Sequence, residues 1–271
     1  MDLQLTNKTA LITGSSSGIG ASIAHVLASE GVRVVLHGRN LARADGVAGA
    51  IRAEGGVVHI TLGDLSTDEG ARAVAEATRI ALGGAPDILV NNAGGGDGEP
   101  RSWESATLAD WHGAFASNLF SAVRLVKSFA AELKTKSWGR IINIATGWSV
   151  SPGTAIPYYG AAKAAMLNTT VSLAQAFAGT GVTVNTVSPG PIHTPAMERV
   201  ARGLAHQLNW GIDEWKEIEK RFAKDLVPTL TGGIGRVEDI ASVVAFLASP
   251  LAGFITAAHL RVDGGNIKSI L

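Results

Sequence analysis

Two side chains that can handle a proton stand four positions apart in this 271-residue chain, Tyr159 and Lys163. The chain has only two tyrosines, Tyr158 and Tyr159, and only the second is followed by a lysine at this spacing. Residues four apart on a helix share a face, so the phenol and the ammonium can meet. A neighbouring cation lowers the pKa of a phenol, which is about 10 in an unperturbed tyrosine. The pair predicts an acid or base that works near neutral pH, although ordinary helix surfaces also carry such pairs.

A glycine-rich turn near the start of the chain is a candidate phosphate site. It reads Thr13-Gly14-Ser15-Ser16-Ser17-Gly18-Ile19-Gly20 and joins a strand pattern to a helical one. Glycines let the backbone turn tightly and let a pyrophosphate approach the free N–H groups at a helix N-terminus. The spacing differs from G-x-G-x-x-G, so that fingerprint does not strictly apply, and the alternative is a tight strand-to-helix connection.

Short apolar runs alternate with longer helical patterns along the rest of the chain. The predicted strands are Thr9–Thr13, Val32–His37, Val57–Leu62, Ile88–Val90, Ile141–Ala145, Val182–Val187 and His259–Val262. The predicted helices are Ile19–Ser29, Leu41–Glu54, Asp68–Leu82, Leu108–Thr135, Tyr159–Ala178 and Val237–Ala248. This alternation is typical of a parallel sheet that is covered on both faces. We expect an α/β fold, a doubly wound parallel sheet of about seven strands.

One segment departs from this rhythm. Residues from about Pro195 to Leu230 follow a strand end and form a helical insertion of mixed polar and aromatic character. An insertion at this position is a candidate lid over a site at the carboxyl ends of the strands. No repeat, linker or composition break marks a second domain, so we expect residues 1–271 to form one domain that carries this lid.

Composition narrows the classes of function. Apolar residues make up 46% of the chain and charged residues 17%, which suits a well-buried core. Lys plus Arg equals Asp plus Glu at 23 each, so no net charge favours a nucleic acid or a membrane surface. The chain has no cysteine, which excludes disulfides and thiolate metal sites, and we expect no metal. Its start lacks a signal-peptide pattern and no apolar run approaches a membrane span, so we expect a soluble, cytoplasmic protein.

Further motifs are spread along the chain after the glycine turn. They are Asn91-Asn92-Ala93-Gly94, Asn118, Pro189-Gly190 and Val262-Asp263-Gly264-Gly265. Together with the glycine turn and the Tyr159/Lys163 pair, they resemble the compact single-domain branch of the short-chain dehydrogenase/reductase family. The resemblance covers nearly the whole chain in the family's order. It implies a Rossmann-like fold with an NAD(P) cofactor, and hydride transfer between a ketone and a secondary alcohol.

The same resemblance implies which residues contact the cofactor. They are Gly14, Ser16, Ser17, Gly18, Ile19, Gly20, Arg39, Asp64, Leu65, Asn92, Ala93, Gly94, Tyr159, Lys163, Pro189, Gly190, Ile192 and Thr194.

The end of the second predicted strand indicates NADP. A site that selects NAD places Asp or Glu about 20 residues beyond the glycines, to bond the ribose hydroxyls. Gly38 stands at that position here and Arg39 follows, and a guanidinium binds phosphate well. The alternative is that Arg39 is a solvated charge at a helix start. Asp64 matches an adenine-contacting position, or it belongs to a helix N-cap with Ser66 and Thr67.

The resemblance also assigns catalytic roles. Tyr159 would be the general acid in reduction, or the base in the reverse direction. Lys163 would lower the pKa of Tyr159 and hold the nicotinamide ribose. Asn118 would support a water-linked proton path from the lysine, unless its amide only bonds locally.

The family's catalytic serine is the point of departure, because Thr146 stands at that position, thirteen residues before Tyr159. Threonine offers the same hydroxyl, but its methyl group restricts rotamers and crowds the pocket. Ser149 and Ser151 are nearby alternatives for the same role.

The expected pocket wall comprises Gly95–Gly98, Gly147-Trp148, Pro191–Met197 and the lid. The lid's apolar residues are Met197, Leu204, Leu208, Trp210, Trp215, Phe222 and Leu226, which would serve equally well as the lid's own core. We expect NADPH-dependent reduction of a moderately apolar carbonyl, either like a 3-oxoacyl reductase or on another small ketone. The alternative is a catalytically weak dinucleotide-binding regulatory or scaffold protein. We also expect a homotetramer, or a dimer, built through the long helices at Leu108–Thr135 and Tyr159–Ala178.

Overall fold

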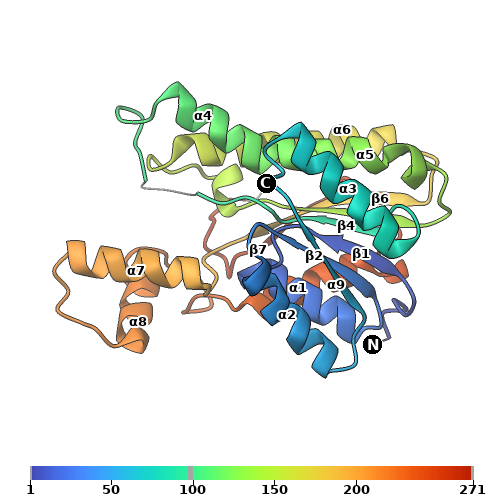
Figure 1. Ribbon diagram of the computed structural model, residues 1–271. Helices are drawn as coiled ribbons and strands as arrows, with labels where there is room; N and C mark the ends of the chain where they lie inside the picture. Colours follow the sequence, from blue (N-terminus) through green and yellow to red (C-terminus); the bar gives the residue numbers. More distant parts are fainter. Residues whose placement is uncertain (1, 97–99, 270–271) are drawn as a thin grey trace.

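Seven parallel strands form one sheet at the centre of the protein (Figure 1). The computed structural model describes residues 2–96 and 100–269. The strands are β1 (Thr9–Ile12), β2 (Arg33–Gly38), β3 (Val58–Leu62), β4 (Ile88–Asn91), β5 (Gly139–Ile144), β6 (Val182–Pro189) and β7 (His259–Val262). Their order across the sheet is β3-β2-β1-β4-β5-β6-β7. The predicted fold class and number of strands are confirmed.

Helices cover both faces of this sheet. They are α1 (Gly18–Ser29), α2 (Leu41–Ala53), α3 (Asp68–Leu82), α4 (Leu108–Phe115), α5 (Ser121–Lys134), α6 (Pro157–Ala176), α7 (Pro195–Gln207), α8 (Trp215–Asp225) and α9 (Val237–Ala248). Successive side chains of a strand point to opposite faces. Ala10 and Ile12 of β1 therefore enter a core with α1 and α9, whereas Leu11 enters a second core with α3 and α5. In Figure 1, α3, α5 and α6 lie on one side of the sheet and α1, α2 and α9 on the other.

The helix that the sequence predicts over Leu108–Thr135 is interrupted. A π-helical turn, η1 (Ala116–Phe120), separates α4 from α5. A π turn departs from the regular α-helical hydrogen-bond ladder, and such turns are frequent at functional sites. Here the Ala114 carbonyl accepts a hydrogen bond of 3.0 Å from the side chain of Asn118. The interruption therefore coincides with a residue that the sequence places in the site.

The chain changes direction across the sheet after β3. It moves outward from β1 through β2 to β3 and then returns to β4, on the other side of β1. Open α/β sheets bind ligands in the crevice at such a switch point, outside the carboxyl ends of the strands. The glycine turn follows β1 and Asn92 follows β4, so both lie at this crevice.

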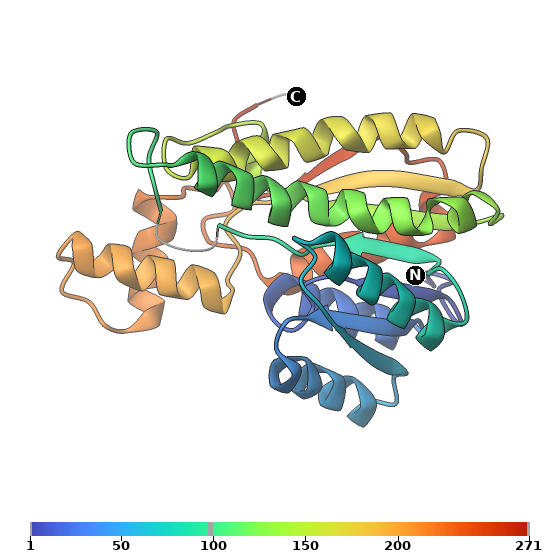
Figure 2. The ribbon, with the colours of Figure 1, turned by 45° about the horizontal axis from the view of Figure 1, so that its top comes forward.

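The predicted lid forms α7 and α8, which project beyond the sheet in both views (Figures 1 and 2). Its apolar side chains pack mainly against one another, in a small core of Ala201, Ala205, Ile218, Phe222, Ala223 and Ile234, bordered by Met197, Leu204, Trp210 and Trp215. Leu208 and Leu226 stay exposed. The apolar side chains of the lid thus form mainly the lid's own core, as the second of the two sequence interpretations holds, and not a substrate surface.

Both ends of the lid are fixed to each other where they join the body. Ile192 and Gly235 form a parallel bridge, and the backbone N–H of His193 donates to the Gly235 carbonyl at 2.8 Å. The His193 ring stacks on Trp215 of α8 with 4.9 Å between ring centroids. These contacts give the lid a defined base.

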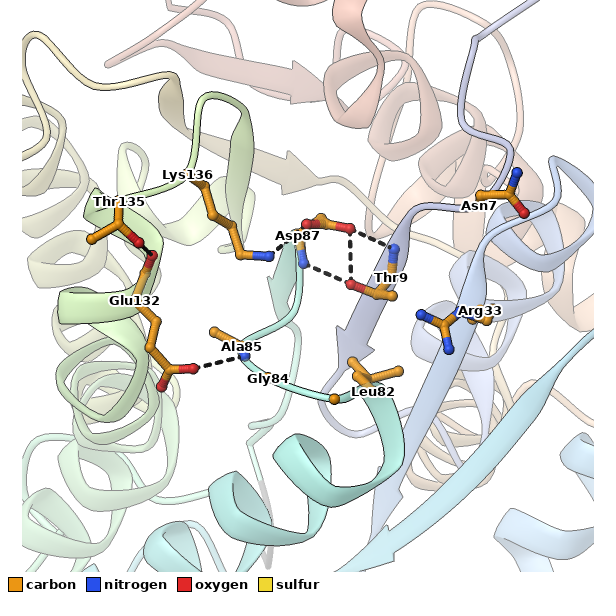
Figure 3. Close-up of a pocket in the computed structure, with 11 residues that line it drawn as sticks. Asn7, Thr9, Arg33, Leu82, Gly84, Ala85, Asp87, Glu132, Thr135 and Lys136 are labelled. Carbon is orange, nitrogen blue, oxygen red and sulfur yellow. Dashed lines mark hydrogen bonds and ion pairs between the residues drawn. The ribbon is translucent and has the colours of Figure 1, made fainter.

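A polar cavity of about 400 Å³ lies at the opposite edge of the sheet, where the strands begin (Figure 3). The Asp87 carboxylate accepts hydrogen bonds from the backbone N–H and the hydroxyl of Thr9 and from the ammonium of Lys136. Glu132 accepts one from the backbone N–H of Ala85 at 2.9 Å. These groups bond one another and tie β1, the start of β4 and the end of α5 together. We therefore assign this cavity a structural role.

None of the described helices is both long and apolar enough to cross a membrane.

Candidate active site

A second cavity, of about 720 Å³, lies at the glycine turn. Nine of the predicted cofactor residues line it: Gly14, Ser16, Ser17, Gly18, Ile19, Gly20, Asn92, Gly94 and Thr194. The rest of the lining falls into two groups. The sequence interpretation missed His25, Ala42, Arg43, Gly46, Val47 and Ala50, whereas it placed Pro195, Ala196 and Arg199 in the pocket wall or the lid. Four of the missed residues could have been found from their spacing. Arg43, Gly46, Val47 and Ala50 recur at helical spacing and so share one face of α2.

Close backbone packing explains the glycines of the turn. Gly14 has a φ of +63°, a conformation that side chains disfavour. A Cβ atom at Gly20 would lie 2.5 Å from both the Gly14 carbonyl oxygen and the Asn92 side chain. The Asn92 amide donates to the carbonyls of Thr13 at 2.8 Å and Gly14 at 3.1 Å. The end of β4 therefore holds the turn in place.

The charge of this cavity suits an anion. Among the described residues its lining contains no Asp or Glu, but it contains the guanidinium groups of Arg43 and Arg199. The first turn of α1 has no side-chain cap, whereas α2 is capped by Asn40 and α3 by Thr67. Uncapped N–H groups and the helix dipole favour negative charge at such a terminus. The cavity is therefore complementary to a phosphate group.

The end of β2 has little room for an acidic side chain. A Cβ atom at Gly38 would lie 3.0 Å from the Cβ and Oγ atoms of Ser16. Arg39, which comes next, is exposed. Hydrogen bonding with Ser66 is the main cause that lowers the pKa of Asp64, and the charge of Arg39 adds to it. The Asp64 carboxylate accepts the Ser66 N–H at 2.9 Å, and the next residue, Thr67, is the N-cap of α3. These contacts match the N-cap alternative for Asp64.

Tyr159 and Thr146 meet, as the family motif predicts. Burial raises the pKa of the Tyr159 phenol, and a hydrogen bond with the Thr146 side chain partly offsets that rise. The net direction is opposite to the lowering expected from Lys163. Desolvation of the phenolate outweighs the effect of Thr146, which is the one group among the described residues that lowers this pKa. Tyr158, in contrast, is buried and packs edge-on against Trp111, at 6.3 Å between ring centroids.

Lys163 is buried one helical turn beyond Tyr159, with a relative exposure of 3%. Its ammonium donates to the carbonyl of Ile144, the last residue of β5, at 2.7 Å. Burial lowers the pKa of Lys163 to about 8. The lysine is therefore held at the end of the strand that leads to Thr146.

Asn118 lies in the π turn and is fully buried. Its side-chain oxygen accepts the Gly95 N–H at 2.8 Å, and its amide donates to the carbonyls of Gly95 at 3.1 Å and Ala114 at 3.0 Å. Asn118 thus bonds locally, and it fixes the loop after β4 against the helix.

The two alternative serines are placed differently from Thr146. The Ser149 hydroxyl is buried and has no hydrogen-bond partner within residues 2–96 and 100–269, while Ser151 is exposed. Thr146, unlike either serine, lies close enough to lower the pKa of Tyr159, which favours the threonine as the site's hydroxyl.

The remaining predicted cofactor residues also follow strand ends but lie outside the cavity lining. Leu65 and Ile192 are buried, Pro189 ends β6, and Gly190 donates its N–H to Val262 at 3.0 Å. The Cα atom of Ala93 lies 3.0 Å from the point where a Cβ on Gly14 would stand. Residues 97 and 98 of the predicted pocket wall are outside the described residues.

The C-terminal tail reaches the site beside Thr146, which the sequence did not indicate. A Cβ atom at Gly147 would lie 3.0 Å from the Cγ1 atom of Ile267. Arg261 holds this tail by donating to the carbonyls of Ile267 and Ser269. No local sequence pattern predicts this contact, because it depends on where the C-terminal tail folds back onto the sheet.

Comparisons with known proteins identify the family. The family model for short chain dehydrogenases matches residues 8–204. The uncharacterized oxidoreductase YvaG of Bacillus subtilis is 36% identical over 273 residues, covering 100% of both chains. A 3-oxoacyl-[acyl-carrier-protein] reductase of Aquifex aeolicus is 32% identical over 98% of this chain and 99% of its own. The crystal structure of L-sorbose reductase from Gluconobacter frateurii, complexed with NADPH and L-sorbose, matches with a TM-score of 0.92, at 33% identity and full coverage of both chains.

The family model matches most of the chain, and these relatives match its sequence and its fold over nearly the whole length. The chain belongs to the short-chain dehydrogenase/reductase family and is an oxidoreductase that acts on CH–OH groups with a nicotinamide dinucleotide cofactor.

Proposed function

We propose that the protein is an NADPH-dependent reductase of a moderately apolar ketone, with Tyr159 as the general acid. The observation that carries this proposal is that the Thr146 side chain lies close enough to the Tyr159 phenol to lower its pKa, one helical turn from the buried Lys163. A phenol, a hydroxyl and an ammonium grouped in this way can protonate and hold a carbonyl oxygen.

The cavity at the glycine turn fits the phosphates of a dinucleotide. The uncapped start of α1 and the acid-free lining with Arg43 and Arg199 suit the pyrophosphate. Arg39 would hold the 2′-phosphate of NADP, and Gly38 leaves little room for the carboxylate that would select NAD. Asp64 and Leu65 would border the adenine. Ala93, Pro189, Gly190, Ile192 and Thr194 would line the path towards the nicotinamide.

The chain's own residues would then orient the substrate and handle the proton, while the cofactor supplies the hydride. Thr146 would donate a hydrogen bond to the carbonyl oxygen, and Tyr159 would transfer its phenolic proton to that oxygen as charge develops there. Lys163 would hold the nicotinamide ribose and stabilise the phenolate that remains. Asn118 would support the path that returns a proton to Tyr159, by holding the Gly95 loop.

The substrate class rests on the pocket's expected walls. Gly147 and Trp148 follow Thr146 directly, and the apolar side chain of Ile267 lies against Gly147. Both a 3-oxoacyl chain and another small ketone fit this description. One relative is a 3-oxoacyl-[acyl-carrier-protein] reductase, while a similar structure is that of a reductase of L-sorbose, a more polar ketone. We propose one dinucleotide-binding and catalytic domain over residues 1–271, with α7 and α8 as its lid.

A ketone panel tests the proposal. The oxidation of NADPH and of NADH would be followed at 340 nm with 3-oxoacyl thioesters, L-sorbose and small aliphatic ketones, for the parent and for Tyr159→Phe. Turnover by the parent that the variant loses would support the reductase. A protein that binds NADPH yet turns over no member of the panel would instead fit the binding or scaffold alternative.

A further inference from the structure

His37, near the end of β2, contacts the segments that follow two neighbouring strands, β1 and β3, beside the cofactor cavity. It is the penultimate residue of β2 and is buried, with 4% relative exposure. Its Nδ1 atom accepts the backbone N–H of Gly14 at 3.1 Å. Its Nε2 atom lies 3.1 Å from the carbonyl oxygen of Gly63, directly after β3. One imidazole thus joins the glycine turn to the strand end that precedes Asp64.

The hydrogen-bond partners of His37 fix the tautomer and the protonation of its imidazole ring. The N–H of Gly14 is a donor, so Nδ1 must accept, and the proton of the neutral imidazole must be on Nε2, where it donates to Gly63. A second proton on Nδ1 would face the Gly14 N–H, donor against donor. Burial lowers the pKa of His37, the bond to Gly63 and the charge of Asp64 raise it, and the charge of Arg39 lowers it. The net shift is downward, which agrees with a neutral ring.

The backbone of His37 strengthens the same connection. Its carbonyl accepts the Ser15 N–H at 2.9 Å, and its N–H donates to the Ser15 hydroxyl at 3.0 Å. The regular pairing of β1 with β2 ends one residue earlier, at Ile12 with Leu36. His37 and Ser15 therefore extend the connection between the strands into the turn, where Gly14 adopts its φ of +63°.

We infer that His37 is a positioning residue for the dinucleotide: its neutral imidazole holds Gly14 and Gly63 at a fixed separation and so shapes the adenosine half of the cofactor site. The inference rests on the proposed cofactor site. His37 touches neither Tyr159 nor Lys163 in any described hydrogen bond, so it should govern cofactor affinity and leave the chemical step alone.

A series of variants separates the two contacts of the ring. His37→Asn places an acceptor at the branch point that Nδ1 occupied, so it keeps a partner for the Gly14 N–H and loses the bond to Gly63. His37→Leu removes both bonds at similar volume. His59→Leu is the matched control, because His59 is an exposed histidine on the neighbouring strand β3.

We expect His37→Leu to raise the Kd of NADP⁺ and of NADPH about tenfold or more, since it leaves a buried donor unpaired. His37→Asn should stay within about threefold of the parent, and kcat at saturating cofactor should change less than about twofold in both, because the lost bonds affect positioning only. Lowering the pH from 8 to 5 should weaken NADP⁺ binding more in the parent than in His37→Asn; the cofactor's own phosphate titrates equally in both.

Amide hydrogen exchange in the absence of cofactor gives a readout that does not depend on the proposed function. The Gly14 amide should exchange faster in His37→Leu than in the parent or in His59→Leu. Unchanged exchange and cofactor affinities within about twofold of the parent would overturn the inference. If His37→Leu does not fold, an equal pH response in the parent and in His37→Asn would overturn it. A parent that binds no dinucleotide would reject the proposed function, while the exchange result would still decide whether His37 holds the turn.

Discussion

The ammonium of Lys163 donates a 2.7 Å hydrogen bond to the carbonyl of Ile144 at the end of β5. Among the described residues this is the only hydrogen bond of that ammonium, and it places a buried charge against a single neutral acceptor. A charge in such surroundings costs stability, because burial removes hydration that one carbonyl does not replace. A residue proposed for catalysis therefore weakens the fold that holds it.

Lys163→Met should make the protein more stable at pH 7, by about 1–3 kcal/mol, while it abolishes turnover. The pKa of Lys163 falls from 10.5 to about 8 on folding. Between these values the unfolded chain binds more protons than the folded one, so the stability of the parent rises with pH there. The advantage of the variant should accordingly shrink between pH 8 and pH 10.5. Urea unfolding at pH 7 and pH 10 measures it, with the exposed Lys216→Met as control; a variant less stable than the parent at pH 7 would contradict the expectation.

Tyr159→Phe should nearly abolish turnover and leave cofactor affinity within a few-fold. The hydroxyl is proposed to act in the transition state, so its loss should affect the rate more than binding. Stopped-flow turnover and a cofactor titration separate the two effects. Tyr158→Phe is the matched control, since that tyrosine packs against Trp111 in the core. A Tyr159→Phe enzyme with most of its rate would refute the assignment of the acid.

Thr146→Val should lower kcat/KM about 10²- to 10³-fold at nearly constant shape, the scale for losing one donor to a developing oxyanion. Thr146→Ser should retain activity and accept bulkier ketones, because a methyl group beside the carbonyl is removed. Steady-state kinetics over ketones of increasing size measures both. Full activity in Thr146→Val would move the donor elsewhere, and the buried hydroxyl of Ser149 would then be the next to substitute.

NADPH should bind more tightly than NADH, by roughly tenfold to a hundredfold, the value of one charge-assisted bond to the 2′-phosphate. Arg39→Ala should remove most of this difference by weakening NADPH alone. Arg52→Ala, on the exposed surface of α2, should change neither affinity. Calorimetric titration of each protein with both cofactors decides the matter, and equal affinities in the parent would reject the proposed role of Arg39.

The protein should sediment as a homotetramer, or as a dimer, at micromolar concentration. Phe120 and Val171 are about two-fifths exposed along the helices predicted to form one interface, and Phe254 near the start of β7 is fully exposed. Burying such side chains against another copy would remove apolar surface from water. Sedimentation velocity provides the measurement; a monomer at this concentration would exclude the proposed assembly.

The fold class followed from short-range pattern alone. Alternating apolar runs and helical segments predict the parallel sheet, because strand and helix periods are local properties of the chain. Strand limits were off by a residue or two, as at β6, which runs on to Pro189. The glycine turn and the Tyr159/Lys163 spacing were also readable, since close backbone approach and a shared helix face are set by nearby residues.

What the sequence could not supply are contacts between distant segments and the effects of burial. The bridge from His37 to Gly14 and Gly63, the tail against Gly147, and the lining by Arg43 and Arg199 all depend on how separate elements pack. The sequence predicts a lowered pKa for Tyr159, whereas in the structure this pKa is raised. Helix spacing predicts a neighbouring charge but not desolvation, which dominates here. Desolvation is set by every element that surrounds the site, and only the tertiary structure fixes that enclosure.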